Sequence, residues 1–157
     1  MKGKILHKFM PAFLIIAAYA PWMPPDARAQ NNNKMATTAG LEVGMSASIT
    51  VSPSATLTVK GSLTINPGGE IINQGTIKGY GTWENNGIFN ERTGIVILSG
   101  TGDCIQGATT FNNLEIDVTG TTDISATLGD NQKVWNTLTL TKGIFDVTGG
   151  GSDSLIL

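Results

Sequence analysis

Side chains that could carry out chemistry are few in this sequence of 157 residues, and they form no recognisable catalytic motif. The one histidine, His7, lies in an N-terminal leader that we expect to be removed, and the one cysteine is Cys104. Without histidine, the mature chain has no imidazole to activate a serine or cysteine nucleophile and none to bind zinc. We interpret Cys104 as a small buried apolar side chain and not as a reactive thiol. A single cysteine forms no internal disulfide.

Carboxylates offer the remaining route to catalysis. The candidates are Asp103, Asp117, Asp123 and Asp130, with Arg92 or Lys133 as the cation. General acid–base catalysis needs two carboxyl groups held close together with separated pKa values. No short motif in this sequence forces two of them together, so we predict solvated acids and no enzymatic activity.

We predict no metal site and no cofactor. The calcium-binding nonapeptide pattern of repeat proteins is approached once, by residues 149–155 (GGGSDSL), without the glycine spacing or the repetition that define it. Calcium takes about six to eight oxygen ligands, and the segment supplies one aspartate.

Residues 1–29 have the features of a signal peptide. A basic start (MKGKILHK) precedes a short apolar run interrupted by prolines, and Ala27–Ala29 (ARA) matches the small-x-small cleavage site. The run is too short for a stable membrane anchor, and no second long apolar segment follows it. We therefore expect cleavage after Ala29 and a protein that is secreted or held at the cell surface.

The mature chain would be acidic. Four of the ten Lys and Arg residues and one of the twelve Asp and Glu residues lie in the leader, which leaves six basic and eleven acidic residues. Nucleic acids and anionic membranes are bound through clustered Lys and Arg, so we expect neither as a partner. The acidic residues are spread thinly along the sequence, which indicates solubility and not a docking tail.

The body of the chain is predicted to be all-β. Residues 30–40 are small and polar without periodicity, and we predict that they form a flexible lead-in. From Leu41 to Leu157, short stretches such as Ser48–Val51 and Thr56–Val59 alternate polar and apolar residues, which is typical of strands. No segment after Leu41 has helical periodicity.

The strongest signal in this region is a period of six. Apolar residues recur six apart at Ile65, Ile71, Ile77, Trp83, Phe89 and Ile95, and a second repeat places residues 135–140 (WNTLTL) 24 positions after residues 111–116 (FNNLEI). A hexad fits one short strand and a corner, where glycine tolerates a positive φ and asparagine can satisfy backbone groups. Three or four hexads, about 18 to 24 residues, would make one coil of a parallel β-solenoid, or β-helix, with inward residues stacked in columns.

An antiparallel β-sandwich or meander is the alternative fold. Residues 83–89 (WENNGIF) place Asn-Gly between strand-like flanks, the pattern of a hairpin turn. However, the Gly-x-apolar phrase around it recurs every six residues. Strands joined by two-residue turns would then have only about four residues, shorter than usual. We therefore favour the solenoid.

Three stretches resemble the repeat regions of large secreted, adhesin-like β-solenoid surface proteins of Gram-negative bacteria: residues 75–102 (GTIKGYGTWENNGIFNERTGIVILSGTG), 110–116 (TFNNLEI) and 134–150 (VWNTLTLTKGIFDVTGG). The resemblance implies a parallel β-helix outside the cell, acting in attachment or as a stalk, with a glycan or a surface protein as partner. It transfers no catalytic residues. Polysaccharide lyases and hydrolases share the β-helix fold, so such an enzyme is the alternative function.

The sequence stops at residues 154–157 (SLIL), inside an expected strand. We therefore expect a fragment or a truncated gene product. The open strand edge at Leu155–Leu157 would favour end-to-end self-association.

Two surface features bear on ligands. Tyr80 lies off the six-residue register and is predicted to be an exposed ring available for ligand contact, whereas Trp83, Phe89, Phe111 and Trp135 are predicted to fill the core. Alternating threonines at Thr56–Thr58 and Thr137–Thr141 would suit an ice-binding array. We favour this function less because their spacing is irregular.

Overall fold

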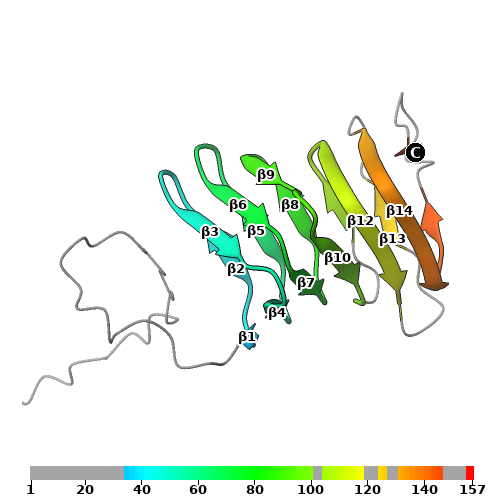
Figure 1. Ribbon diagram of the computed structural model, residues 1–157, viewed down its shortest axis with the longest axis horizontal. Coiled ribbons are helices and arrows are strands. Elements are labelled where there is room, and N and C mark those ends of the chain that lie inside the picture. Colours follow the sequence, from blue (N-terminus) through cyan, green and yellow to red (C-terminus); the bar gives the residue numbers. More distant parts are fainter. Residues whose placement is uncertain (1–33, 101–103, 119–123, 127–130, 147–154) are drawn as a thin grey trace, which may run out of the picture.

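The computed structural model describes residues 34–100, 104–118, 124–126, 131–146 and 155–157. These residues form sixteen β-strands and no helix, arranged in three sheets that are the walls of a stack of coils along one axis (Figure 1). The signal peptide predicted at residues 1–29 lies outside the described residues.

The strands of each sheet follow one another along the stack. Sheet A contains β1 (Lys34–Thr37), β4 (Thr56–Val59), β7 (Thr76–Gly79), β10 (Ile95–Leu98), β12 (Thr109–Asp117), β14 (Gln132–Lys142) and β16 (Leu155–Ile156). Sheet B contains β2 (Leu41–Val43), β5 (Leu63–Ile65), β8 (Trp83–Asn85), β11 (Cys104–Gln106), β13 (Ile124–Ala126) and β15 (Phe145–Asp146). Sheet C contains β3 (Ser48–Val51), β6 (Glu70–Asn73) and β9 (Ile88–Asn90).

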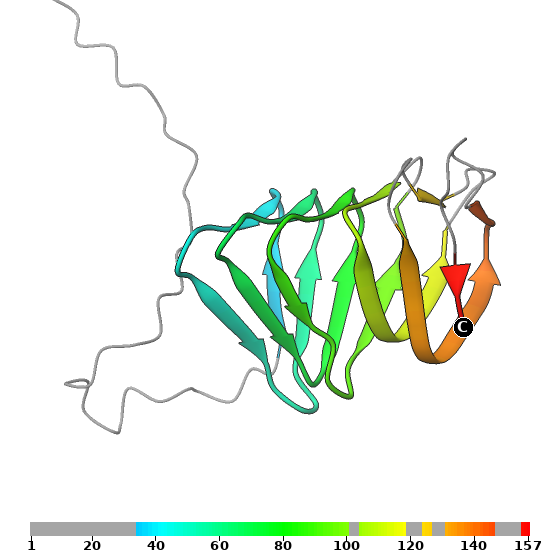
Figure 2. The same ribbon diagram turned by 90° about the horizontal axis from the view of Figure 1, so that it is seen from above.

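Every pairing between the described strands is parallel, and the paired residues are a full circuit of chain apart. Leu41 pairs with Leu63, 22 residues later, and Leu63 pairs with Trp83, 20 residues later. The chain visits sheets A, B and C in rotation from β1 to β9, and Figure 2 shows the successive coils side by side. The fold is therefore a parallel β-solenoid, and the prediction made from the six-residue period is confirmed over the antiparallel alternative.

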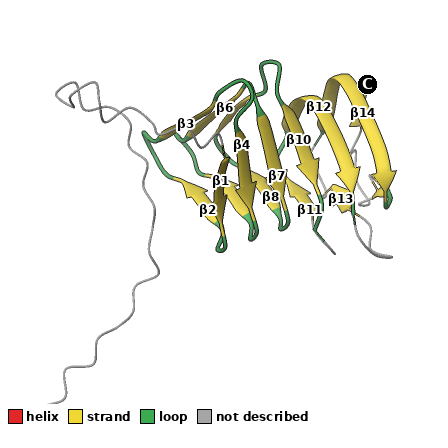
Figure 3. Ribbon diagram, turned by 60° about the horizontal axis from the view of Figure 1, so that its bottom comes forward, coloured by secondary structure: helices red, strands yellow, loops and turns green. Residues whose placement is uncertain are grey.

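Each hexad is one wall of the solenoid. Ile65, Ile71, Ile77 and Trp83 lie in turn on sheets B, C, A and B, and each is at most 1% exposed. Corners join the walls, as Figure 3 shows in green. Because the walls alternate inward and outward residues, each wall places one or two apolar side chains in the narrow interior, as Leu63 and Ile65 of β5 show.

The six-residue series breaks at Ile95, which was predicted to face inward. Ile95 pairs with Thr76 on the outer face, and Val96 pairs with Ile77 in the core and is 1% exposed. The preceding corner contains Arg92 at a φ of 40°. The inward residue after Phe89 is thus seven positions on, not six, so the prediction for Ile95 is wrong.

The pairing predicted from the 24-residue repeat is confirmed for residues 114–116 and wrong for Phe111. Leu114 pairs with Leu138 as predicted, but Phe111 pairs with Val134 and not with Trp135. A register shift between these pairs leaves two residues of β14, Trp135 and Asn136, opposite the single residue Asn112. A bulge of this kind redirects side chains. Val134 therefore takes the core position, and Trp135 is 61% exposed instead of buried.

The other predicted core aromatics are correctly placed. Trp83 and Phe111 are at most 1% exposed, and Phe89 packs against the core. The rings of Trp83 and Phe89 meet edge to face with centroids 4.8 Å apart, and Trp83 Nε1 donates a hydrogen bond to Thr109 Oγ1 at 3.2 Å. The indole N–H is therefore satisfied inside an apolar interior, as burial of tryptophan requires.

Glycines of the Gly-x-apolar phrase are needed for close approach between coils and not for a positive φ. The described glycines with positive φ are Gly68, Gly107 and Gly143. A Cβ on Gly81 would instead lie 2.5 Å from the backbone carbon of Gly61, in the coil below. The predicted reason for glycine at these corners is therefore wrong, although their position at corners is correct.

Asparagine side chains close corners as predicted. Asn73 is 1% exposed, its Nδ2 donates to the backbone oxygen of Ile95 at 3.2 Å, and its Oδ1 accepts from the N–H of Gly75 at 3.3 Å. Asn85 accepts in the same way from the N–H of Gly87. These amides satisfy backbone groups that the turning chain leaves without a partner.

The first strand begins inside the segment predicted to be a flexible lead-in. Within residues 30–40, β1 occupies Lys34–Thr37 and pairs in parallel with β4. The prediction is wrong for these four residues, because Met35 packs against the core below Leu57 and so makes them part of the first coil.

Candidate functional site

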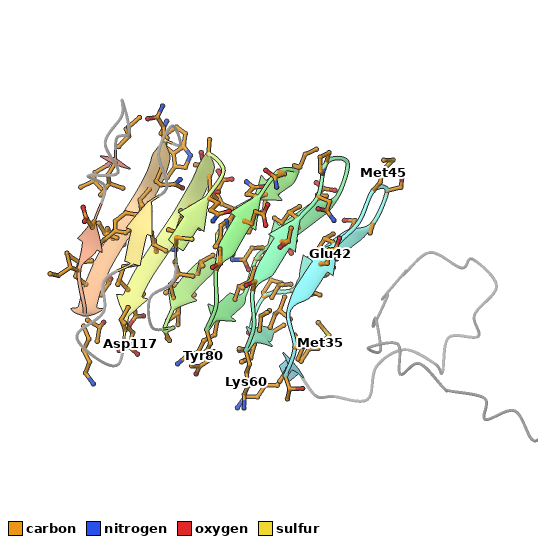
Figure 4. The ribbon with its side chains drawn as sticks, turned by 180° about the vertical axis from the view of Figure 1, so that it is seen from behind. Met35, Glu42, Met45, Lys60, Tyr80 and Asp117 are labelled. Atoms are coloured by element: carbon orange, nitrogen blue, oxygen red, sulfur yellow. The ribbon has the colours of Figure 1, made fainter. Side chains whose placement is uncertain are left out.

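Tyr80 stands at the corner that leads from β7 to sheet B. Its N–H donates to the backbone oxygen of Val59 at 2.9 Å, which holds this corner against the coil below. The residue is 39% exposed, and Lys78 Nζ lies 5.4 Å from the centroid of its ring. Figure 4 shows Tyr80 and Lys60 on the same margin of the stack. The predicted exposure is confirmed, and contact with a ligand stays a prediction.

Trp135, which was predicted to fill the core, forms a second exposed aromatic site. Lys133 Nζ lies 3.6 Å from the centroid of the Trp135 ring, close enough for a cation–π interaction. The two sites share one spacing, Lys-x-aromatic, in Lys78–Tyr80 and Lys133–Trp135. This spacing was the available signal, because residues two apart on a strand project from the same face.

Between these sites, the outer face of sheet A carries Ile95 and Ile97 on β10 and polar side chains on β12 and β14. Asn136 Nδ2 donates to Asn113 Oδ1 at 2.8 Å, and Thr141 Oγ1 donates to Glu115 Oε1 at 2.8 Å. These bonds link β12 to β14 on the outside of the wall.

The threonine array suggested for ice binding is interrupted. Thr56 pairs with Thr76, but Ile95 and Asn113 follow before Thr137 in the same row. The parallel row through Thr58 contains Lys78 next. The described part of sheet A therefore lacks the regular hydroxyl lattice that such a function needs.

The outer face of sheet B carries carboxylates engaged with neighbouring side chains. Glu84 Oε2 accepts from Thr64 Oγ1 at 3.3 Å, and Glu84 Oε1 accepts from Asn86 Nδ2 at 2.8 Å. Glu42 Oε1 accepts a hydrogen bond from Asn66 Nδ2. These groups connect one coil to the next or brace a corner.

The acids and cations considered for catalysis are not gathered in the described residues. Asp117 ends β12, where its register partner in β14 is Lys142. Lys133 is the register partner of Thr110, near the start of β12. Arg92 lies on the corner before β10. Three of the candidate acids, Asp103, Asp123 and Asp130, fall outside the described residues.

No group of three or more His, Cys, Asp or Glu residues that could hold a metal ion occurs among the described residues. Of the weak calcium-like segment at residues 149–155, only Leu155 is described.

Cys104 is half-buried at the start of β11 and not in the core, which corrects the prediction of a fully buried side chain. Its Sγ lies 3.2 Å from Gln106 Nε2 and 3.7 Å from Thr82 Oγ1. The next residue, Ile105, takes the inward position and is 0% exposed.

Comparison with family models, curated proteins and solved structures gave no match to this chain. Within the described ranges, no helix is long and apolar enough to cross a membrane.

Proposed function

We propose that the chain is a secreted or cell-surface β-solenoid repeat protein with a structural or adhesive role and no catalytic activity. On this proposal, its outer walls bind an extracellular glycan or a surface protein. The observation that carries the proposal is the construction of the walls. Apolar columns such as Leu57, Ile77 and Val96 fill the interior. The outside of β4 and β7 carries threonine and lysine, whereas the outside of β10 carries two isoleucines, so the outer rows mix polar and apolar side chains.

This construction suits a rod that presents a repeating surface. Strands in the middle of the stack are hydrogen-bonded to the coils on both sides, so a force along the axis is shared by backbone ladders in three walls. Ligands would meet rows of side chains spaced by about 4.8 Å, the separation of adjacent strands. Such a surface matches an extended partner better than a small molecule, because the described walls gather no polar cluster around one point.

Two features of the sequence support an extracellular setting. Residues 1–29 have the organisation of a signal peptide. The resemblance of residues 75–102 to repeats of Gram-negative adhesin-like proteins supports the same proposal.

The proposal is tested by separating binding from turnover. We expect the mature protein to be retained on a glycan array or on a surface protein, and to release no reducing or unsaturated sugar from a panel of neutral and acidic polysaccharides. An Ile77→Asp variant, which should not fold, serves as the control for non-specific retention. Release of sugar by the folded protein would contradict the proposal in favour of a polysaccharide lyase or hydrolase, and absence of any retention would contradict the adhesive role.

A further inference from the structure

Charge is sorted by wall in the solenoid, although it is spread thinly along the sequence. The described strands of sheet A hold four lysines, Lys34, Lys78, Lys133 and Lys142, against two acids, Glu115 and Asp117. The described strands of sheet B hold the acids Glu42, Glu84 and Asp146 and no basic residue. A chain with a net negative charge therefore has one wall with a positive excess.

The positive wall also carries both lysine–aromatic pairs. Lys78 Nζ lies 5.4 Å from the Tyr80 ring centroid, and Lys133 Nζ lies 3.6 Å from that of Trp135. Tyr80 is 39% exposed and Trp135 is 61% exposed. In each pair, an ammonium group is held beside an exposed ring before any ligand arrives, which lowers the ordering cost of binding.

The two pairs lie at opposite margins of sheet A, on either side of a bend in its long strands (Figure 2). Only residues 113–116 of β12 pair with β10, whereas Phe111, earlier in the same strand, packs against Phe89 of sheet C. Strand β7 is separated from β14 by β10 and β12, so the pairs are about 14 Å apart across the sheet at the usual strand spacing. The strand pairings place Lys78 in register with Thr139, in the second half of β14, whereas Lys133 lies near the start of that strand. The two lysines are therefore also far apart along the strand direction. A ligand that touches both pairs must therefore be a chain that runs diagonally across the sheet, past the outward isoleucines of β10 and over Asn113 and Thr137.

We propose that the outer face of sheet A binds an anionic polysaccharide, with Lys78–Tyr80 and Lys133–Trp135 as its two contact points. The inference rests on the proposed glycan-binding function and names the class of glycan. Sugar rings present C–H faces that pack on exposed aromatic rings, and the carboxylate or sulfate groups of the polymer pair with the neighbouring lysines. The acidic wall of sheet B would repel the same polymer, so binding would be confined to one side of the rod.

Nucleic acid fits this surface less well. Binding to a phosphate backbone relies on many cationic contacts, and the strands of sheet A have an excess of only two positive charges. Aromatic rings next to single lysines suit a polymer of sugar rings that carries its charges at intervals.

Dextran, carboxymethyl-dextran and dextran sulfate test the proposal, because they share one backbone and differ in charge. We expect the mature protein to bind both charged polymers at least ten times more tightly than dextran, with an affinity that falls as salt rises. Trp135→Ala and Lys133→Gln should each weaken binding to the charged polymers at least threefold. Met45→Ala removes a side chain that is 80% exposed at the corner between β2 and β3, at the other end of the stack from β14, and should leave binding unchanged.

The possible failures are distinguishable. Equal binding to dextran and to the charged polymers, or full binding by Trp135→Ala, would overturn the inference and leave the adhesive function standing. Loss of binding to every glycan and surface protein would overturn both proposals. Tighter binding to single-stranded DNA than to carboxymethyl-dextran would reassign the wall to nucleic acid. Thermal melting of each variant, with an unchanged midpoint expected for these outward substitutions, shows that a loss of binding is not a loss of fold.

Discussion

Replacing Ile77 by aspartate is expected to abolish or nearly abolish folding. Ile77 is 0% exposed and lies in one column between Leu57 of the coil below and Val96 of the coil above. A carboxylate at this position would lose its water, and the described neighbours in the column offer it no charge or hydrogen-bond donor. The cost of burying an unpaired polar or charged group is several kcal/mol, a large fraction of the stability of a small domain, at about 5–15 kcal/mol.

The matched control is Lys78→Asp, one residue further along the same strand. Lys78 projects from the outer face of β7, so the new carboxylate would stay in water and the free energy of unfolding should change by less than about 1 kcal/mol. The measurement is the midpoint of urea denaturation followed by circular dichroism. Equal losses for the two variants would reject the assignment of inward and outward faces.

Gly81→Ala is expected to produce the second largest loss, through the backbone of the neighbouring coil. A Cβ at Gly81 would lie 2.5 Å from the carbon and 2.7 Å from the oxygen of Gly61, and backbone atoms cannot swing aside as a flexible side chain does. The two coils would have to separate at this corner, which would stretch the ladder between β5 and β8. We expect a loss of about 1–3 kcal/mol, the usual cost of forcing extra volume into a close-packed site.

Gly44→Ala is the control for the same chemical change. Nothing lies within 4 Å of a Cβ built at Gly44, so the extra methyl group points into open space. Alanine also restricts the unfolded chain, so stability should be unchanged or raised by up to about 1 kcal/mol. Denaturation midpoints that fall equally for both variants would show that close stacking of the corners does not explain the glycine phrase.

The sequence predicted the walls of the solenoid because the period of six is set by geometry that repeats. One short strand and one corner consume six residues, and the inward residue of each wall must be apolar, as at Ile65, Ile71 and Ile77. The two misplaced residues, Ile95 and Trp135, both follow a local insertion of one residue. Because side chains alternate between faces, a shift by one position exchanges inside and outside. The sequence gives no marker of where such an insertion falls.

The candidate site was less accessible to prediction than the fold. Tyr80 could be identified because it lies off the repeat register, but Trp135 occupies a position that an unbroken register would bury. The separation of charge between sheets A and B was also hidden, because each sheet collects strands from segments about 20 residues apart. Lysines and acids that are neighbours in the sequence therefore end on different walls.

The central claim is that the strands wind in parallel coils and do not form hairpins. Its most direct test compares two engineered cysteine pairs that share one residue, both made in a Cys104→Ser background. In the solenoid, Thr64 and Glu84 are register partners on adjacent coils of sheet B, at a separation of about 5 Å that suits a disulfide. In a hairpin turning at Asn86-Gly87, Glu84 would instead oppose Phe89, which in the solenoid lies on sheet C. We predict that the Thr64→Cys/Glu84→Cys pair oxidises readily in the native protein, whereas Glu84→Cys/Phe89→Cys does not. Bridging of the second pair without the first would contradict the parallel solenoid.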